Sequence, residues 1–340
     1  MTWPSVTVVF LAYNRRDDLR VSLQKTLGEL DYERDRLDVI VVDNASEDGT
    51  AEMLARDFPE VRVIERSTNS GVSGFNDGFA AAGGDYVLAL DDDCHLPSDG
   101  LRRAVEEAER HRAELVSFGV RSLQEPSYRF DLHECATGLF SFWGCSVLMR
   151  RQVLEALGGY DPEIFVWANE LEFMLRFFDG GFRHLHLPEV VAIHAKPPGP
   201  WRDGVILERP YRVNSHNLGY VAGKLLQPRD AFEAVVALLT CNLRDGLRMQ
   251  RVALKALPDT LRGFMRGLGH RRPVRPEVSR TYRHNFEIFA SPWWVARPLS
   301  QRIHDALAPE RARPAGPGRR DRWLAERARF YPDHSAVLEL

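Results

Sequence analysis

The sequence predicts an α/β protein with a doubly wound, Rossmann-like and mostly parallel central sheet, followed by a C-terminal α-helical extension. Three observations support this prediction. Apolar, β-branched segments alternate with helical segments over residues 6–120, and the connections between them are short. Three consecutive aspartates directly follow one of the apolar segments. After Arg209 this alternation stops, and longer helical patterns replace it.

The elements follow one another as repeated β-α units. Residues 6–12 (VTVVFLA) are continuously apolar and β-branched, which is typical of a strand buried on both faces of a parallel sheet. The helix after this strand begins at Asp17 and Asp18, acidic residues that favour a helix N-terminus. Up to residue 120 the pattern predicts strands at 6–12, 37–42, 61–64, 87–90 and 115–120, and helices at 17–29, 50–57 and 101–114. The glycine-punctuated loop that begins near Asn69 also runs into an alanine-rich helix before Asp85.

The remaining elements are less regular. Paired glycines end two helical segments, as glycine commonly does at helix C-termini. We expect a strand at 145–149, helices at 151–157 and 165–178, a strand pair or edge strand at 184–194, and helices at 218–249, 252–265 and about 321–330.

Asp91, Asp92 and Asp93 follow the strand expected at 87–90 and are the strongest chemical signal in the chain. Ligands of open α/β sheets bind at the carboxyl ends of the strands, and crowded carboxylates need a cation or hydrogen-bond donors to neutralise them. Carboxylate ligands favour Mg²⁺ or Mn²⁺, and such ions commonly hold phosphates. The sequence therefore predicts a metal-bridged nucleoside diphosphate here. The alternative is that the acids cap a helix beginning near 97–99.

Composition narrows the class of protein. The chain has 340 residues, of which 44% are hydrophobic and 27% charged, as is ordinary for a globular protein. Its apolar runs are far shorter than a membrane span, and the N-terminal apolar segment lacks a basic leader. The four cysteines show neither metal-binding nor disulfide-framework spacing, which favours free thiols in a reducing compartment. We therefore expect a cytoplasmic protein.

Charge is distributed unevenly along the chain. Residues 242–329 hold 20 Lys and Arg against 8 Asp and Glu, although the whole chain carries a formal charge of −3. Such a basic segment suggests peripheral contact with anionic lipid at the inner face of a membrane, or an anionic acceptor. A solvated helical face would explain the same charges. Nucleic acid is not an expected partner.

The order and spacing of several motifs resemble family 2 glycosyltransferases. These motifs are VVFLAYNRRDDL, VIVVDNASEDGT, NSGVSGFNDG, LALDDDC, GCSVLMRR with GGYDP, ANELEFMLR and a late His194, and they cover roughly residues 5–220. Within the family, the chain looks most like the bacterial rhamnosyltransferase and galactofuranosyltransferase-like branch. The resemblance implies the GT-A fold, a nucleotide-sugar donor and transfer of the sugar with inversion at the anomeric carbon.

The resemblance also assigns roles on the nucleotide side. It places Asp43 at the nucleobase or its ribose, with Ala12 and Asn14 in the same pocket, and a carboxylate there suits the ring N–H of uracil or thymine. UDP- or dTDP-sugars are therefore the expected donors. Helix capping is the alternative role for Asp43. Asn69 and Asn76 belong to the glycine-punctuated loop that approaches the nucleotide and sugar in the family.

Metal ligands and the base follow from the same resemblance. Asp93 is the expected principal ligand of Mg²⁺ or Mn²⁺, His194 a further ligand, and Asp91 or Asp92 would hold the ribose, with Asp91 also near the metal. ANELEFMLR places Glu170 at the position of the catalytic base. Here the chain departs from the family, because Asn169 stands where an acid is common and Glu replaces the usual Asp. Glu172 is the alternative base and Asp161 a remote third.

These motifs divide the chain into a glycosyltransferase domain at 1–225, with a nucleotide half at 1–95 and an acceptor half at 96–225, and a basic helical region at 226–340. The acceptor could be a glycan, a lipid-linked glycan or a small metabolite. Two other functions remain open. One is an inactive glycosyltransferase-like scaffold. The other is a sugar nucleotidyltransferase, which is disfavoured because AYNRRDD lacks a glycine-rich phosphate loop.

Overall fold

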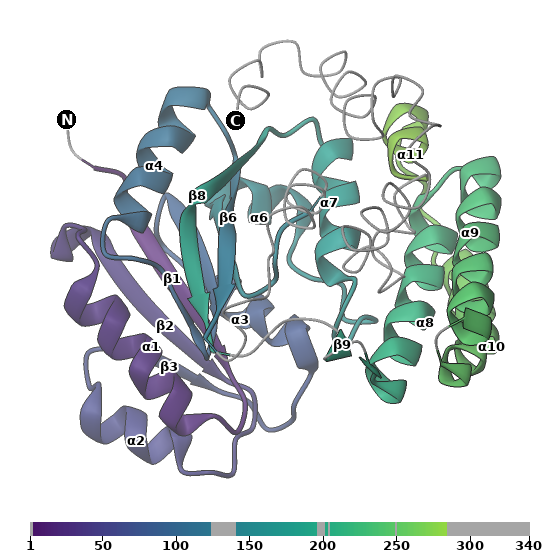
Figure 1. The fold of residues 1–340 in the computed structure, drawn as a ribbon. Coiled ribbons are helices and arrows are strands. Elements are labelled where there is room, and N and C mark those ends of the chain that lie inside the picture. The colour runs from purple at the N-terminus through teal and green to yellow at the C-terminus, as the bar shows by residue number, and fades with distance from the viewer. Residues whose placement is uncertain (1–2, 124–140, 196–200, 203–204, 249, 284–340) are drawn as a thin grey trace, which may run out of the picture. The chain divides into compact units, whose positions relative to one another are not determined.

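The computed structural model describes residues 3–123, 141–195, 201–202, 205–248 and 250–283 (Figure 1). The chain forms two compact units, Met1–Gly199 and Pro200–Leu340. The sequence instead suggested a boundary at 225–226. The observed division falls earlier because α8 (Glu208–Leu225) packs against α10 (Ala256–Gly269) of the second unit. Residues 284–340 of the predicted basic region lie outside the described residues.

The first unit contains an eight-stranded sheet in the order β3-β2-β1-β4-β7-β6-β8-β5. Valines and leucines fill β1 and β4, and most of these side chains are fully buried, which explains their continuous apolar runs. The strands are β1 Val6–Ala12, β2 Leu37–Asp43, β3 Arg62–Glu65, β4 Tyr86–Asp91, β5 Cys94–His95, β6 Leu115–Ser122, β7 Ser146–Arg150 and β8 His184–His194.

Helices flank this sheet, and Figure 1 shows α1 and α2 in front of it. Gly78 lets the third helix approach β1 and β2 closely, because a Cβ there would overlap Val9 and touch Val42. The helices of this unit are α1 Arg16–Glu29, α2 Thr50–Asp57, α3 Phe75–Ala81, α4 Gly100–His111, α6 Arg151–Leu157 and α7 Asn169–Asp179, with short 3-10 turns η1 Arg34–Arg36 and η2 Gly71–Gly74. The predicted doubly wound α/β architecture is confirmed.

Inside the sheet β7 runs against both of its neighbours, and the short edge strand β5 also runs antiparallel to β8. β7 pairs antiparallel with both β4 and β6, whereas β1, β2, β3 and β4 pair parallel with one another. β7 therefore starts at the sheet edge where β4 and β6 end. The Asp91 amide donates to the Cys145 carbonyl at 3.0 Å at this edge. This arrangement brings the start of β7 beside the aspartates.

The second unit is mainly helical. Its elements are β9 Trp201–Arg202, β10 Val205–Ile206, α8, α9 Pro228–Arg248, η3 Arg251–Lys255, α10 and α11 Pro276–Arg283. A buried polar network joins its helices: the Tyr211 hydroxyl donates to Asn242 at 2.9 Å, and the Asn242 amide donates to the Thr260 hydroxyl at 2.8 Å. Buried polar groups need such partners, so this network helps to fix how the helices pack.

Glycines allow α8 and α10 to touch backbone to backbone. A Cβ on Gly219 would overlap the Thr260 carbonyl, and a Cβ on Gly263 would overlap the His216 carbonyl. A Cβ on Gly223 or on Gly267 would likewise overlap a backbone carbonyl of the other helix. Glycine within a helix costs about 1 kcal/mol relative to alanine, and here the close packing of the two helices offsets that cost.

Gly263→Val should strongly destabilise the protein, because the added side chain meets backbone atoms that cannot rotate away. We expect a loss of about 3 kcal/mol or more in the free energy of unfolding, at the upper end of overpacking effects. Urea unfolding measures this loss. Gly269→Ala is the matched control, since Gly269 ends the same helix and a Cβ added there would meet no atom within 4 Å. Equal stability of the two variants would refute the close packing.

Candidate functional site

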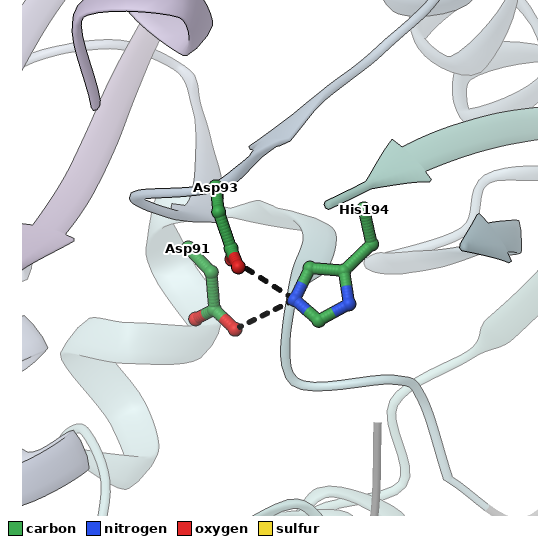
Figure 2. A group of neighbouring side chains, drawn as sticks. All are labelled: Asp91, Asp93 and His194. Carbon is green, nitrogen blue, oxygen red and sulfur yellow. Dashed lines mark ion pairs between the residues drawn. The ribbon is translucent and has the colours of Figure 1, made fainter. Parts of the chain in front are cut away.

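The aspartates lie at the carboxyl end of β4, as the sequence predicted. β4 ends at Asp91, and β5 then pairs antiparallel with the end of β8, with Cys94 opposite His194. His194 Nε2 lies 3.0 Å from Asp93 Oδ1 and 3.8 Å from Asp91 Oδ2 (Figure 2). Residues about 100 positions apart in the sequence therefore meet because two strands of the same sheet pair.

Arg15 is a member of this cluster that the sequence did not reveal. Its guanidinium lies 2.6 Å from Asp93 Oδ2 and 3.2 Å from Asp92 Oδ1. The Tyr13 amide donates to the other oxygen of Asp92 at 3.1 Å. Its position in the sequence could have indicated this, because Arg15 follows β1 and therefore lies at the sheet edge that also holds the aspartates. Arg15 and His194 thus supply positive charge to three crowded carboxylates.

Burial and these charges shift the titration of the cluster. Burial is the main cause that raises the pKa of Asp92 to about 7, against the opposing effect of Arg15. Burial works in the other direction on His194, but Cys145, Asp93 and Asp91 together raise its pKa to about 10. The carboxylates thus favour the protonated form of His194, which can pair with Asp93 and Asp91.

Asp91, Asp93 and His194 form a donor set that fits a divalent cation. One ligand atom from each residue lies within 4.8 Å of the others. Two carboxylates suit Mg²⁺ or Mn²⁺, and an imidazole shifts the preference toward Mn²⁺ and heavier ions. Binding would require His194 to lose its proton, so metal would displace the proton that now pairs with the acids.

The predicted nucleotide residues form one connected loop structure. Asp43 ends β2, is almost fully buried, and accepts from the Ser46 amide at 2.9 Å. Asn14, which has a positive φ of 52°, accepts from the Glu47 amide at 2.7 Å. The buried Ala12 carbonyl accepts from the Asn44 amide at 2.8 Å. The structure thus brings Ala12, Asn14 and Asp43 together where the loops after β1 and β2 meet.

Asn69 and Asn76 make contacts within the protein. The Asn69 side-chain oxygen accepts from the Asn44 amide group and the Gly71 backbone amide, both at 2.8 Å. The Asn76 side-chain amide donates to the Tyr160 carbonyl, and its oxygen accepts from the Tyr160 backbone amide, both at 2.8 Å. These bonds hold the loop around η2 and α3. The roles of Asn69 and Asn76 at the nucleotide or sugar remain predictions.

Glu170 lies in the first turn of α7, and its side chain is only partly exposed. The two residues before the helix, Trp167 and Ala168, both adopt φ of 63°, a left-handed conformation that is strained for non-glycine residues. Burial raises the pKa of Glu170 to about 7, with Asp91 adding to the shift and the Gly144 amide opposing it. A carboxyl group with this pKa suits proton transfer near neutral pH.

Glu172, the alternative base, is fully buried and held on the other side of the helix. Arg176 Nε donates to both of its carboxylate oxygens at 3.0 Å, and the same guanidinium donates to the Leu157 and Gly159 carbonyls. Glu172 therefore anchors the arginine that ties α7 to the end of α6. These contacts favour Glu170 over Glu172 as the base.

Gly144 is a second site residue that the sequence did not reveal, although it lies two residues before the start of β7 at the site edge. Its backbone amide is bonded to Glu170, and an added Cβ would overlap Glu170 Oε1. Gly144→Ala should therefore displace the carboxylate and lower kcat about 100-fold, as misplacement of a reacting group by about 1 Å does. Steady-state kinetics tests this, with Gly83→Ala as control because Gly83 has open space around it. Normal kcat in Gly144→Ala would contradict the placement.

Comparison with known proteins identifies the family. The sequence model described as glycosyl transferase family 2 matches residues 7–158, which include the aspartates and Gly144. Residues 7–158 are therefore a family 2 glycosyltransferase domain. The match ends before Glu170 and His194. The assignment to the rhamnosyltransferase and galactofuranosyltransferase-like branch remains a prediction.

A similar curated protein is "Succinoglycan biosynthesis protein ExoO" from Rhizobium meliloti (strain 1021), which is 35% identical over 115 residues, or 33% of this chain. The chain spans only about a third of that relative's length, 32%. Among solved structures, the Pyrobaculum calidifontis mannosyltransferase PcManGT "in complex with GDP-Man and Mn2+" is 21% identical, with a TM-score of 0.54, over 99% of this chain and 88% of that one. These similarities confirm the GT-A fold.

A second structural neighbour is S. aureus TarS 1-349 in complex with UDP-GlcNAc, with a TM-score of 0.53 and 16% identity, covering 88% of this chain and 92% of that one. Among the helices that the structure describes, none combines the length and apolar character needed to cross a membrane.

Proposed function

We propose that this protein is a metal-dependent, inverting glycosyltransferase that moves a sugar from a UDP- or dTDP-sugar to an acceptor hydroxyl. The observation that carries the proposal is the position of Glu170 near the cluster of Asp91, Asp93 and His194, close enough for Asp91 to raise the Glu170 pKa. An acid cluster suited to a cation and a carboxyl suited to proton transfer thus share one site.

Each residue has a defined part in this reaction. Asp93, Asp91 and His194 would hold Mn²⁺ or Mg²⁺, which supplies charge neutralisation for the leaving diphosphate when bound. Arg15 lies beside Asp92 and Asp93, where it can donate to a phosphate oxygen. Asp92 would bind the ribose.

Glu170 would take the proton of the acceptor hydroxyl as that oxygen attacks the anomeric carbon. The oxygen–anomeric carbon bond forms as the bond from this carbon to the diphosphate breaks, on the opposite face of the sugar. Inversion follows from a single displacement of this kind.

The donor base is assigned through Asp43, with Ala12 and Asn14 in the same loop structure. A carboxylate at this position can accept from the ring N–H of uracil or thymine. The neighbouring structures hold GDP-Man in one case and UDP-GlcNAc in another, so a donor panel should include guanine as well. The acceptor, whether glycan, lipid-linked glycan or small metabolite, and a cytoplasmic location at the inner membrane face remain predictions.

Release of nucleoside diphosphate from a panel of UDP-, dTDP- and GDP-sugars tests the proposal, measured with Mn²⁺ and with a chelator. We expect metal-dependent turnover of one uridine or thymidine donor, in the form of slow hydrolysis when the acceptor is absent. Nucleotide binding without turnover of any donor, in the presence of glycan and lipid-linked acceptors, would instead support the inactive scaffold. Asn169, which replaces a common acid, keeps that second function open.

A further inference from the structure

The second unit exposes an unusual amount of apolar side chain on two helices. On α9, Phe232 and Leu247 are 67% and 73% exposed, and on α10 Met265 is 64% exposed. At 100° per residue, the exposed apolar positions of each helix fall within an arc of about 60°, so each helix presents a stripe. The two stripes comprise Phe232, Val236, Leu243 and Leu247 on α9 and Leu261, Met265 and Leu268 on α10.

Positive charge accompanies these stripes. Residues 205–283 contain 15 Lys and Arg and only 6 Asp and Glu. Arg262 and Arg266 are exposed and follow Leu261 and Met265 directly around α10. Arg262 pairs with Asp259 at 2.8 Å, yet Asp259 is also shared with Arg212, so the local surplus of positive charge persists. An apolar stripe beside arginines is the pattern of a helix that lies in a membrane interface.

We infer that the exposed face of α10 docks on an anionic lipid bilayer. Leu261, Met265 and Leu268 would enter the boundary between headgroups and acyl chains, while Arg262 and Arg266 meet lipid phosphates. Charge argues against the two other occupants. A second copy carries the same positive surplus, and residues 284–340 contain 9 Lys and Arg against 7 Asp and Glu, so neither offers the opposite charge.

The inference of a docking surface rests on the exposure of apolar side chains and on charge, and it does not depend on the proposed transfer reaction. Docking would nevertheless affect that reaction. A lipid-linked acceptor would be found at the same bilayer, so docking would raise its local concentration near the enzyme. The inference therefore favours a membrane-borne acceptor over a small metabolite.

Sedimentation of the full chain with vesicles tests the inference. We expect binding to phosphatidylcholine vesicles that contain phosphatidylglycerol, little binding to phosphatidylcholine alone, and weaker binding as salt rises. The double variant Arg262→Gln, Arg266→Gln and the double variant Leu261→Gln, Met265→Gln should each reduce binding roughly tenfold or more. Val21→Gln is the control, because Val21 is 49% exposed on α1 of the first unit.

Two results would overturn the inference. One is absence of vesicle binding, or equal binding to neutral and anionic vesicles, by a chain whose thermal unfolding is normal. The other is a concentration-dependent dimer, seen by light scattering, that Leu261→Gln, Met265→Gln dissociates. That dimer would show that a second copy covers the surface.

Discussion

Glu170→Gln should lower kcat by about 10²–10⁴, the range that a positioned general base contributes, and should leave the KM for the donor nearly unchanged. Glutamine has almost the same shape and can still accept from the Gly144 amide, but it cannot take a proton. Steady-state kinetics with a working donor and acceptor measures the effect. Near-normal kcat would refute the assignment of Glu170 as the base.

The pKa of Glu170 gives this prediction a pH dependence. Because burial raises that pKa to about 7, the carboxylate form that accepts a proton is depleted below pH 7, and activity should fall there. The free energy of unfolding depends on pH in the opposite direction. A raised pKa means that the folded state holds the Glu170 proton more tightly than the unfolded state does. Protonated Glu170 therefore stabilises the fold fully below pH 4.5, and this contribution is lost as the pH rises to about 7. Glu170→Gln should therefore unfold at an equal or higher temperature than the parent at about pH 8.

Glu172→Gln is the matched control, and we expect it to lower the stability of the fold but to leave turnover nearly unchanged. Its loss of charge leaves the Arg176 guanidinium without its carboxylate partner, and breaking such a pair commonly costs about 3 kcal/mol. We expect a lower unfolding temperature and a kcat, measured well below that temperature, within a few-fold of the parent. A variant that unfolds normally but loses turnover would make Glu172 the base instead.

Asp93→Asn should have the largest effect on metal binding. The Asp93 side chain is completely buried between Arg15 and His194, so its charge acts in a site with little solvent screening. Removing an outer-shell partner of a metal commonly costs about 10–100-fold in affinity, and removing a direct ligand should cost more. Titration of Mn²⁺ followed by electron paramagnetic resonance measures the affinity directly.

Asp85→Asn controls for the loss of one acidic charge next to β4. Asp85 precedes β4 and binds Ser5 at the opposite end of the strand from the cluster. We expect its Mn²⁺ affinity to match that of the parent. Unchanged affinity in Asp93→Asn would remove Asp93 from the ligand set.

The sequence was sufficient to predict the first half of the sheet and the position of the acids. Local signals determine those features: buried parallel strands are continuously apolar, and their carboxyl ends carry the polar residues. The strand expected at 87–90 is β4, and the three aspartates follow its core. His194 joined the prediction through the family resemblance, and strand pairing of β5 with β8 brings it to the aspartates.

Features that depend on distant contacts were not predictable in the same way. The role of Arg15 requires knowing that the β1 loop approaches the aspartates, and that of Gly144 requires the antiparallel direction of β7. The contact of Asn76 with Tyr160 likewise joins residues 84 positions apart in the sequence, and no local pattern predicts it. The packing of α8 against α10, which places α8 in the second unit, also has no local signal in the sequence.

The most direct test of a metal-dependent donor site is thermal unfolding with UDP, dTDP, GDP and ADP, each with and without Mn²⁺, on the parent chain and on Asp93→Asn. A ligand at about 100 times its dissociation constant adds about 2.7 kcal/mol to stability, which is a measurable shift. We predict stabilisation by UDP or dTDP that requires Mn²⁺ and is absent in Asp93→Asn. Stabilisation by no nucleotide, or equal stabilisation of the variant, would contradict the site proposed at the end of β4.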